Sequence, residues 1–239
     1  MTKTLSLIAI AALAGSANAA LLASETFSYA NGNLVGNGAW AAHSGAGNSP
    51  VQVNNGMMIL EQGSGSREDV NLTAGGPIGA GQTWYASFDM KNTGGNGTVY
   101  FAHFLQGTSN FDARVFITAP TAGGDYTIGF ASSSTIAATW ASDLSFGTFN
   151  KIVIAFTQGT GVARLWINPN AEGDTHLLVN SGFPNTLHEG IGFRQAAGDS
   201  TQMIDNVYLG TTFADVVPAP GPAALLALAG VAVARRRRA

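Results

Sequence analysis

The feature that most constrains the fold of this chain is the division of its apolar residues into short runs, each ended by Gly, Asn, Ser, Thr or Pro. Short apolar runs bounded by turn-forming residues are typical of antiparallel β-strands. The runs that fit this pattern are residues 22–27, 51–53, 57–61, 84–90, 99–105, 113–117, 126–131, 151–157, 163–167, 177–179, 190–194 and 203–209. So many short strands predict an all-β fold of two antiparallel sheets packed face to face, in a sandwich or jelly-roll topology.

Alternation within the runs supports the strand prediction. In residues 85–90 and 164–167 every second side chain falls on one face, as a half-buried strand requires. Gln158-Gly159-Thr160-Gly161 separates two strong runs with residues that tolerate positive φ. Residues 151–167 are therefore expected to form a hairpin.

The N-terminus has the organisation of a secretory signal peptide. Lys3 supplies a positive charge, residues 5–14 form an apolar stretch, and Ala17-Asn18-Ala19 is a small-x-small cleavage site. We expect cleavage after Ala19, so residues 1–19 are excluded from the fold.

The C-terminal segment, residues 216–239, combines a proline-rich motif, an apolar run from Ala223 to Ala234 and a basic cluster. The motif residues are Val217, Pro218, Ala219, Pro220, Gly221 and Pro222, and the cluster is Arg235, Arg236, Arg237 and Arg238. A helix over the apolar run would be about 18 Å long, short of the ~30 Å hydrocarbon core unless it is extended from Val216. Arginines at its end favour the cytoplasmic side, which predicts that the body lies outside the cytoplasm.

This tail resembles the PEP-CTERM sorting signal of Gram-negative and related bacteria. The resemblance rests on Val-Pro-x-Pro, the short apolar helix and the terminal arginines, although Ala219 stands where the family usually has Glu. It implies an exosortase-type membrane protease as a partner, attachment to the membrane before processing, and delivery to the cell surface or extracellular matrix. An ordinary C-terminal membrane anchor without processing is the alternative.

The charge of the body argues against nucleic acid as a partner. Of eleven basic residues, five (Lys3 and the four terminal arginines) lie in the end segments, so six remain against fourteen acidic ones, a net charge of about −8. Nucleic acid binding needs a basic face. The chain has no cysteine, which excludes disulfides and thiol chemistry. Residues 20–215 are long enough for one domain with an adequate core.

Three stretches of the body resemble the concanavalin-A-like or laminin-G-like modules of bacterial surface proteins. They are the opening 25–34 with Gly38-Ala39-Trp40, the hairpin segment 163–169 and the closing segment 204–216. The resemblance implies a lectin-like jelly-roll sandwich whose first and last strands pair. It does not by itself imply a sugar ligand.

Paired catalytic carboxylates are not evident. Glu68 and Asp69 are adjacent and so point to opposite faces of a strand, whereas Glu172 and Asp174 alternate but lie in an expected loop. Retaining glycoside hydrolysis needs two carboxyl groups about 5–5.5 Å apart across a cleft. We therefore assign no catalytic residue and expect a protein that is not an enzyme.

The sequence contains little evidence for a metal site. His43, His103, His176 and His188 lack the spacing of a ligand set. Calcium remains open, because lectin-like sandwiches often bind it, and the candidate oxygen ligands are Asp125, Asp199, Asp205 and Asn206. No other cofactor is expected. The alternative for Asp205 and Asn206 is a bend in the strand held by side-chain to backbone hydrogen bonds.

Tryptophan is the residue type most able to stack on a sugar ring. Trp140 and Trp40 lie in loop-like surroundings and are the candidate ligand contacts, whereas Trp84 and Trp166 lie in strands and are expected in the core. Trp40 has the alternative of packing beneath the sandwich.

These observations predict an exported protein of structural or adhesive role in the cell envelope, on the cell surface or in the extracellular matrix. A polysaccharide-binding lectin-like module is the alternative. A glycoside hydrolase or lyase is a third possibility.

Overall fold

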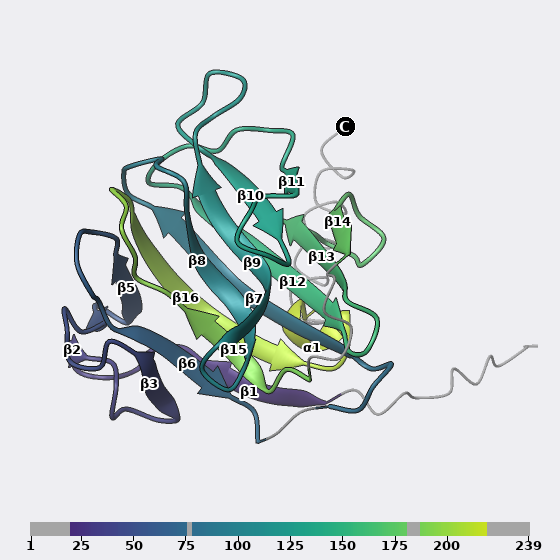
Figure 1. The fold of residues 1–239 in the computed structure, drawn as a ribbon, viewed down its shortest axis with the longest axis horizontal. Coiled ribbons are helices and arrows are strands. Elements are labelled where there is room, and N and C mark those ends of the chain that lie inside the picture. The colour runs from purple at the N-terminus through teal and green to yellow at the C-terminus, as the bar shows by residue number, and fades with distance from the viewer. Residues whose placement is uncertain (1–19, 76–77, 181–186, 219–239) are drawn as a thin grey trace, which may run out of the picture.

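The computed structural model describes residues 20–75, 78–180 and 187–218 and shows a sandwich of two antiparallel β-sheets (Figure 1). This confirms the predicted all-β architecture. The predicted signal peptide and most of the sorting tail, including Ala17, Ala19, residues 219–222 and the terminal arginines, lie outside the described residues. Within the described ranges, no helix has the length and apolar character needed to cross a membrane.

One sheet has nine strands. Along it the order is β14 (Leu177–Asn180), β13 (Val162–Ile167), β12 (Phe149–Thr157), β7 (Thr83–Asn92), β16 (Thr201–Gly210), β5 (Met57–Glu61), β4 (Gln52–Asn54) and β2 (Gly32–Asn33). The ninth strand, β1 (Leu21–Glu25), pairs with β16, so the first and last strands of the domain are neighbours, as the resemblance to lectin-like modules implied.

The second sheet has seven strands and lies in front of the first in Figure 1. Its order is β11 (Ala138–Thr139), β10 (Thr127–Ala131), β9 (Asn110–Thr118), β8 (Val99–Gln106), β15 (Gly190–Phe193), β6 (Asp69–Thr73) and β3 (Trp40–Ser44). Strands β3, β6, β15 and β8 are adjacent although they come from distant parts of the chain.

The main core fills the space between the sheets. Alternate residues of β7, among them Trp84 and Phe88, point inward and are fully buried, as the sequence predicts. From the opposite sheet Phe101 and Phe193 meet Phe88, with ring centroids 6.1 Å and 5.3 Å away in edge-to-face geometry. Burying aromatic rings from both sheets supplies the apolar contact that holds the layers together.

A second, smaller core covers the outer face of the nine-stranded sheet. Phe213 and Val216, on the short helix α1 (Phe213–Val216), pack there against Tyr85 and Trp166. Thr212 caps the helix through a capping box with Asp215. Trp166 is buried as predicted, but it lies in this second cluster and not between the sheets.

The predicted runs all coincide with strands, with ends shifted by a few residues, and β12 and β13 form the expected hairpin. Four strands were not predicted: β2, β3, β6 and β11. Of these, β3 and β6 matter most, because together they form one edge of the seven-stranded sheet.

Candidate functional site

The outer face of the seven-stranded sheet, away from the core, is where strand β15 brings functional groups together. Ile191 and Phe193 of β15 point into the core, so Gly190, Gly192 and the following Arg194 belong to the opposite face. A Cβ atom added to Gly192 would lie 2.5 Å from Nε2 of His103. The imidazole ring of His103 therefore lies directly over this glycine, on the outer face.

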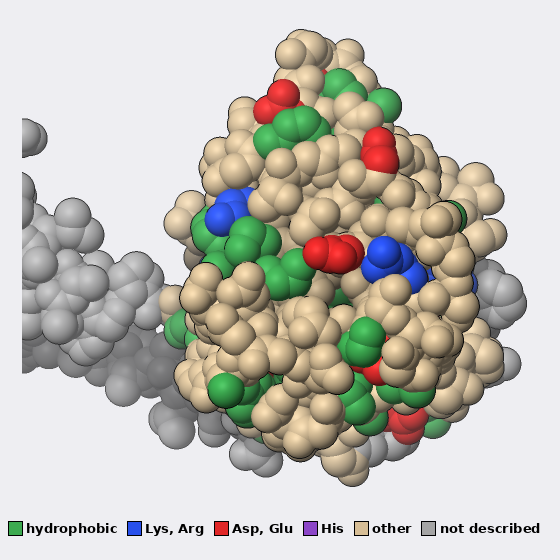
Figure 2. Space-filling view, turned by 90° about the vertical axis from the view of Figure 1, so that its left-hand side faces the viewer, with side chains coloured by type: hydrophobic (Ala, Val, Ile, Leu, Met, Phe, Trp, Pro, Cys, Tyr) green, Lys and Arg blue, Asp and Glu red, His purple; other side chains and the backbone are tan. Residues whose placement is uncertain are grey.

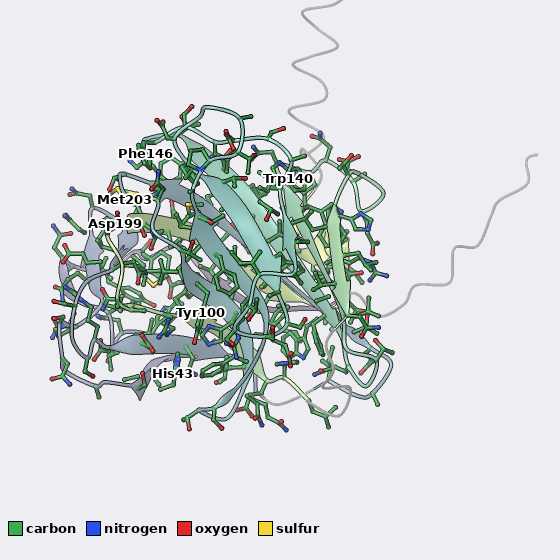
Figure 3. All side chains as sticks on the ribbon, turned by 45° about the horizontal axis from the view of Figure 1, so that its top comes forward. His43, Tyr100, Trp140, Phe146, Asp199 and Met203 are labelled. Atoms are coloured by element: carbon green, nitrogen blue, oxygen red, sulfur yellow. The ribbon has the colours of Figure 1, made fainter. Side chains whose placement is uncertain are left out.

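Aromatic rings and a second histidine surround His103. The ring centroid of Phe111 lies 4.2 Å from that of His103, and the rings of His43 and Tyr100 lie at 5.5 Å and 5.7 Å. These side chains come from β3, β8 and β9. Figure 3 shows His43 and Tyr100 on one side of the molecule, well separated from Trp140 and Phe146.

Two arginines complete the group. The guanidinium carbon of Arg194 lies 4.2 Å from the centre of the Tyr100 ring, and that of Arg114 lies 4.9 Å from the same centre. Both are within the range of a cation–π contact. We call His43, Tyr100, His103, Phe111, Arg114 and Arg194 the outer-face cluster.

The histidine nitrogens of this cluster are buried, and the described residues give them no aligned hydrogen-bond partner. This holds for Nδ1 and Nε2 of both His43 and His103, and the backbone of Val70 approaches His43 without an aligned hydrogen bond. Burial lowers the pKa of His43 to about 4, and the nearby Arg194 acts in the same direction. The pKa of His103 also lies well below its ordinary value, first because of burial and then because of His43 and Arg114. Both rings are therefore neutral at pH 7.

The positive charge of the two arginines is only loosely compensated. Nε of Arg194 lies 3.9 Å from Oδ2 of Asp69, a distance too long for a hydrogen bond. The oxygens of Asp69 instead accept hydrogen bonds from Oγ of Ser44 and the backbone N–H of Gln195, both at 2.8 Å. Nε of Arg114 donates to the backbone oxygen of Phe111, at 3.3 Å, and the described residues place no carboxylate within 4.0 Å of its guanidinium.

This arrangement can bind a polar ligand. His103 is fully buried and forms the floor, while His43, Tyr100, Arg114 and Arg194 are half-buried and reach the surface. Guanidinium groups donate several hydrogen bonds in a fixed plane, and the hydroxyl of Tyr100 can donate and accept. The cluster therefore provides donors and acceptors of the kind that sugar hydroxyl and carboxylate groups engage.

A cavity of about 260 Å³ opens near the same edge of the sandwich. It is lined by Ser49, Pro50, Gln52, Ile59, Glu61, Arg67 and Gln195. Gln195 follows Arg194 directly in the chain, but no residue of the outer-face cluster lines the cavity. Figure 2 shows the side of the molecule nearest β2, β3 and β5, where acidic and basic side chains are scattered among uncharged atoms.

The two tryptophans predicted to contact a ligand lie in different surroundings. Trp40 is only 4% exposed, stacks on Phe27 with ring centroids 5.7 Å apart, and donates from Nε1 to Glu25 at 3.0 Å. It is a core residue, so its proposed role as a ligand contact is corrected. Trp140 is half-buried and lines a cavity of about 160 Å³ with Ala141 and Leu177, where contact with a ligand remains a prediction.

The loop carboxylates considered for catalysis have structural partners. Glu172 accepts a hydrogen bond from the hydroxyl of Tyr85 at 2.6 Å. Asp174 accepts from the backbone N–H groups of Asn170 and Ala171, at 2.7 Å and 3.1 Å, and these hydrogen bonds lower its pKa. Both carboxylates thus belong to the turn after β13.

The candidate calcium ligands do not converge. Three of them accept hydrogen bonds from backbone N–H groups: Asp125 from Phe146, Asp199 from Gly97 and Asp205 from Asn206. Asn206 has φ of 51° at a point where the pairing of β16 with β7 shifts register, so this pair bends the strand. Across residues 20–75, 78–180 and 187–218, no three His, Asp or Glu side chains are grouped to hold a metal ion.

The remaining histidines occupy separate environments. His188 is buried, with Nε2 3.1 Å from Oδ2 of Asp112, although this contact is not aligned as a hydrogen bond. The ring of His176 lies 5.1 Å from that of Trp166. No histidine has the spacing of a ligand set in the sequence, and His43 and His103 come together only through the fold of the sheet.

The chain matches no known family model and no curated protein. Among solved structures, it resembles the carbohydrate recognition domain of Emp47p (8% identity, 81% of this chain and 96% of that one, TM-score 0.51). It also resembles the exoplasmic/lumenal domain of VIP36 in its Ca²⁺/Man-bound form (11% identity, 82% and 92%, TM-score 0.52). A third is the CBM2 module of the Dit protein evolved from Lactobacillus casei BL23 phage J-1 (12% identity, 81% and 96%, TM-score 0.51).

The chain also covers 19% of a much longer sialidase, at 15% identity and a TM-score of 0.49. At these identities the similarities describe the fold. Together with the two-sheet topology, the three similarities with TM-scores above 0.5 show a jelly-roll sandwich with the fold of lectin-like domains.

Proposed function

We propose that the domain is a polysaccharide-binding, lectin-like module and that it binds through the outer-face cluster. The observation that carries the proposal is the convergence of two loosely compensated guanidinium groups and His103 on Tyr100, with His43 against His103, at the surface of the seven-stranded sheet. The carbohydrate recognition domain and the Man-bound domain among the similar structures support it at the level of fold.

The energetics favour a ligand role for the cluster over a purely structural one. A buried polar group without a partner costs about 1–3 kcal/mol. Four imidazole nitrogens in this condition, together with two adjacent cations, make the cluster costly to the folded state. The histidine nitrogens are covered, so a bound glycan would supply partners to the arginines at the rim and offset that part of the cost.

The test is a binding panel of immobilised neutral and acidic polysaccharides, probed with the wild-type chain and single variants. We expect Arg194→Gln and Tyr100→Ala to weaken binding about tenfold, since hydrogen bonds to charged groups contribute about 1.5–3 kcal/mol. Arg164→Gln, on β13 of the other sheet, is the matched control and leaves binding unchanged.

Trp140→Ala distinguishes the two candidate surfaces. If binding is lost in Trp140→Ala and kept in Arg194→Gln, the glycan site lies at the smaller cavity beside β11 and the outer-face assignment is wrong. Release of reducing ends during incubation would instead indicate an enzyme. If the protein binds no polysaccharide in the panel, the glycan-binding proposal is wrong and a structural role is the remaining interpretation.

We also propose that the protein is exported and sorted by a PEP-CTERM-like tail. The described domain ends at the very point where the motif starts, since α1 closes at Val216 and Val217 and Pro218 follow. An exosortase-type protease could cut after these residues without breaking a strand or the helix. Such processing would place the module at the cell envelope, on the cell surface or in the matrix, where glycan binding would give it an adhesive role.

Replacing Pro218 and Pro220 with Ala tests the sorting proposal. We expect the variant to keep a larger mass and to stay with the membrane fraction, as seen by mass spectrometry and fractionation. A mature mass and location identical to those of the wild type would contradict it.

A further inference from the structure

We infer that the outer-face cluster selects glycans that carry carboxylate groups, such as uronic acid polymers. This inference rests on the proposed function, glycan binding at this face, and specifies the class of glycan. It follows from the placement of Arg114 and Arg194 and from the residues around them.

The two guanidinium groups lie close together. Their carbons are 4.9 Å and 4.2 Å from the centre of one ring, that of Tyr100, so they are no more than about 9 Å apart. Two like charges at this separation repel, and an anion within reach of both relieves the repulsion. Guanidinium groups bind carboxylates through two parallel N–H···O hydrogen bonds, which a neutral hydroxyl cannot reproduce.

One carboxylate of the protein competes with a ligand for Arg194, at a distance of 3.9 Å that is too long for a hydrogen bond. The oxygens of Asp69, the nearest acidic side chain to Arg194, accept from Ser44 and Gln195, and its side chain is 11% exposed. The side chain of Arg194 is 30% exposed and is therefore the more accessible member of the pair.

Two of the few basic side chains of this protein lie together in the outer-face cluster. The body carries only six basic residues against fourteen acidic ones, yet two of the six contact the same tyrosine. An acidic surface repels polyanions in general. Binding of an acidic glycan therefore requires a local basic site, and the outer-face cluster is such a site.

The histidines do not turn the cluster into a metal site. In the described structure, no third histidine or carboxylate lies near His43 and His103 in a position to bind the same metal ion. Two guanidinium groups lie beside the histidines. A cation would be repelled by those groups, whereas an anion is attracted. The imidazole nitrogens are buried, so the arginines are the groups of the cluster that a ligand can reach.

The experiment uses matched pairs of polymers with the full chain. Polygalacturonate, alginate and hyaluronan are each compared with the same polymer after its carboxyl groups have been reduced to alcohols. We expect at least one acidic polymer to bind and its reduction to lower the affinity at least about tenfold, the loss expected for a charge-assisted pair. Dextran sulfate is included to separate carboxylate from sulfate recognition.

Variants assign the effect to the arginines. Arg114→Gln and Arg194→Gln are expected to weaken binding of the acidic polymer about tenfold each while leaving the thermal unfolding temperature nearly unchanged. Arg194→Lys, which keeps the charge but not the planar fork, is expected to retain only part of the affinity. Arg164→Gln is the control for loss of one positive charge elsewhere.

The outcomes separate this inference from the proposed function. Equal affinity for a polymer and its reduced form, binding of neutral polymers alone, or equally tight binding of dextran sulfate overturns carboxylate selectivity and leaves glycan binding standing. Carboxylate selectivity is also overturned if Arg114→Gln and Arg194→Gln both bind the acidic polymer with the affinity of the wild type. Absence of binding to every polymer, neutral or acidic, removes the proposed function and the inference together.

Discussion

Gly192→Ala tests the geometry on which the outer-face cluster rests. The added Cβ would lie 2.5 Å, 3.0 Å and 3.2 Å from Nε2, Cε1 and Cδ2 of His103, closer than carbon and nitrogen atoms can pack. The imidazole cannot simply swing away, because Phe111 and His43 lie against it. The φ angle of Gly192 is not positive, so backbone strain does not contribute.

The magnitude follows from two opposing effects. Overpacking in a tightly filled site costs about 1–3 kcal/mol. Replacing glycine with alanine at a compatible backbone position returns about 0.4–1 kcal/mol by restricting the unfolded chain. We therefore expect Gly192→Ala to lower the free energy of unfolding by about 1–2 kcal/mol, whereas Gly173→Ala, with open space around the new Cβ, changes it by less than about 0.5 kcal/mol.

A double-mutant cycle with His103→Ala provides the decisive measurement. Once the imidazole is removed, the Cβ at position 192 has room, so Gly192→Ala should become neutral or stabilising in that background. The coupling free energy, from urea unfolding followed by tryptophan fluorescence, should be about 1–3 kcal/mol. If Gly192→Ala alone is neutral, or if its cost persists without His103, the ring does not lie where we place it.

Three further predictions concern stability. The pKa of His43 is about 4 in the folded protein and near 6.5 in the unfolded chain, so unfolding takes up a proton between these pH values. The free energy of unfolding should therefore fall by about 2 kcal/mol, after allowance for partial exposure, as the pH drops from 6.5 to 4. Urea unfolding at a series of pH values should show a smaller loss for His43→Gln than for the wild type. Glu25→Ala removes an acceptor for the backbone of Phe27, the hydroxyl of Tyr29 and the indole of Trp40, and should cost about 2–3 kcal/mol in the same assay, with no loss if these bonds are unimportant. Ending the chain after residue 212 uncovers the second core and should cost about 3–5 kcal/mol relative to a chain ending after residue 217; equal melting temperatures would show that α1 contributes nothing.

The strands that could be predicted are those in which apolar and polar or small side chains clearly alternate every second residue. Residues 84–90 alternate between large core side chains and outward ones, and β7 follows this pattern closely. The same period is present in β6, where Val70 and Leu72 alternate with Asp69 and Asn71, so this strand could have been recognised. In β3 the signal is absent, because small and polar residues follow Trp40. The two-residue strands β2 and β11 are too short to show a pattern, and they are strands only because they pair with β4 and β10.

The candidate site could not be predicted from local patterns. His43 and His103 are sixty positions apart, and they lie on one sheet face through the strand order β3, β6, β15, β8, in which Gly192 of β15 leaves room for the ring of His103. Nothing near either residue encodes that order. For Trp40 the structure shows the alternative of packing beneath the sandwich: its Gly- and Ala-rich surroundings look like an exposed loop, but the ring is buried and Glu25 accepts from its indole N–H.

The position of β16 has a consequence for how the chain folds. This strand is the last to be synthesised, yet it lies inside the nine-stranded sheet, between β7 and β5, and also pairs with β1. Until residue 210 has left the ribosome, β5 and β7 keep unpaired edges and half of the sandwich cannot close. The chain therefore exposes unpaired strand edges until its C-terminal part is present, and during that time it is open to aggregation.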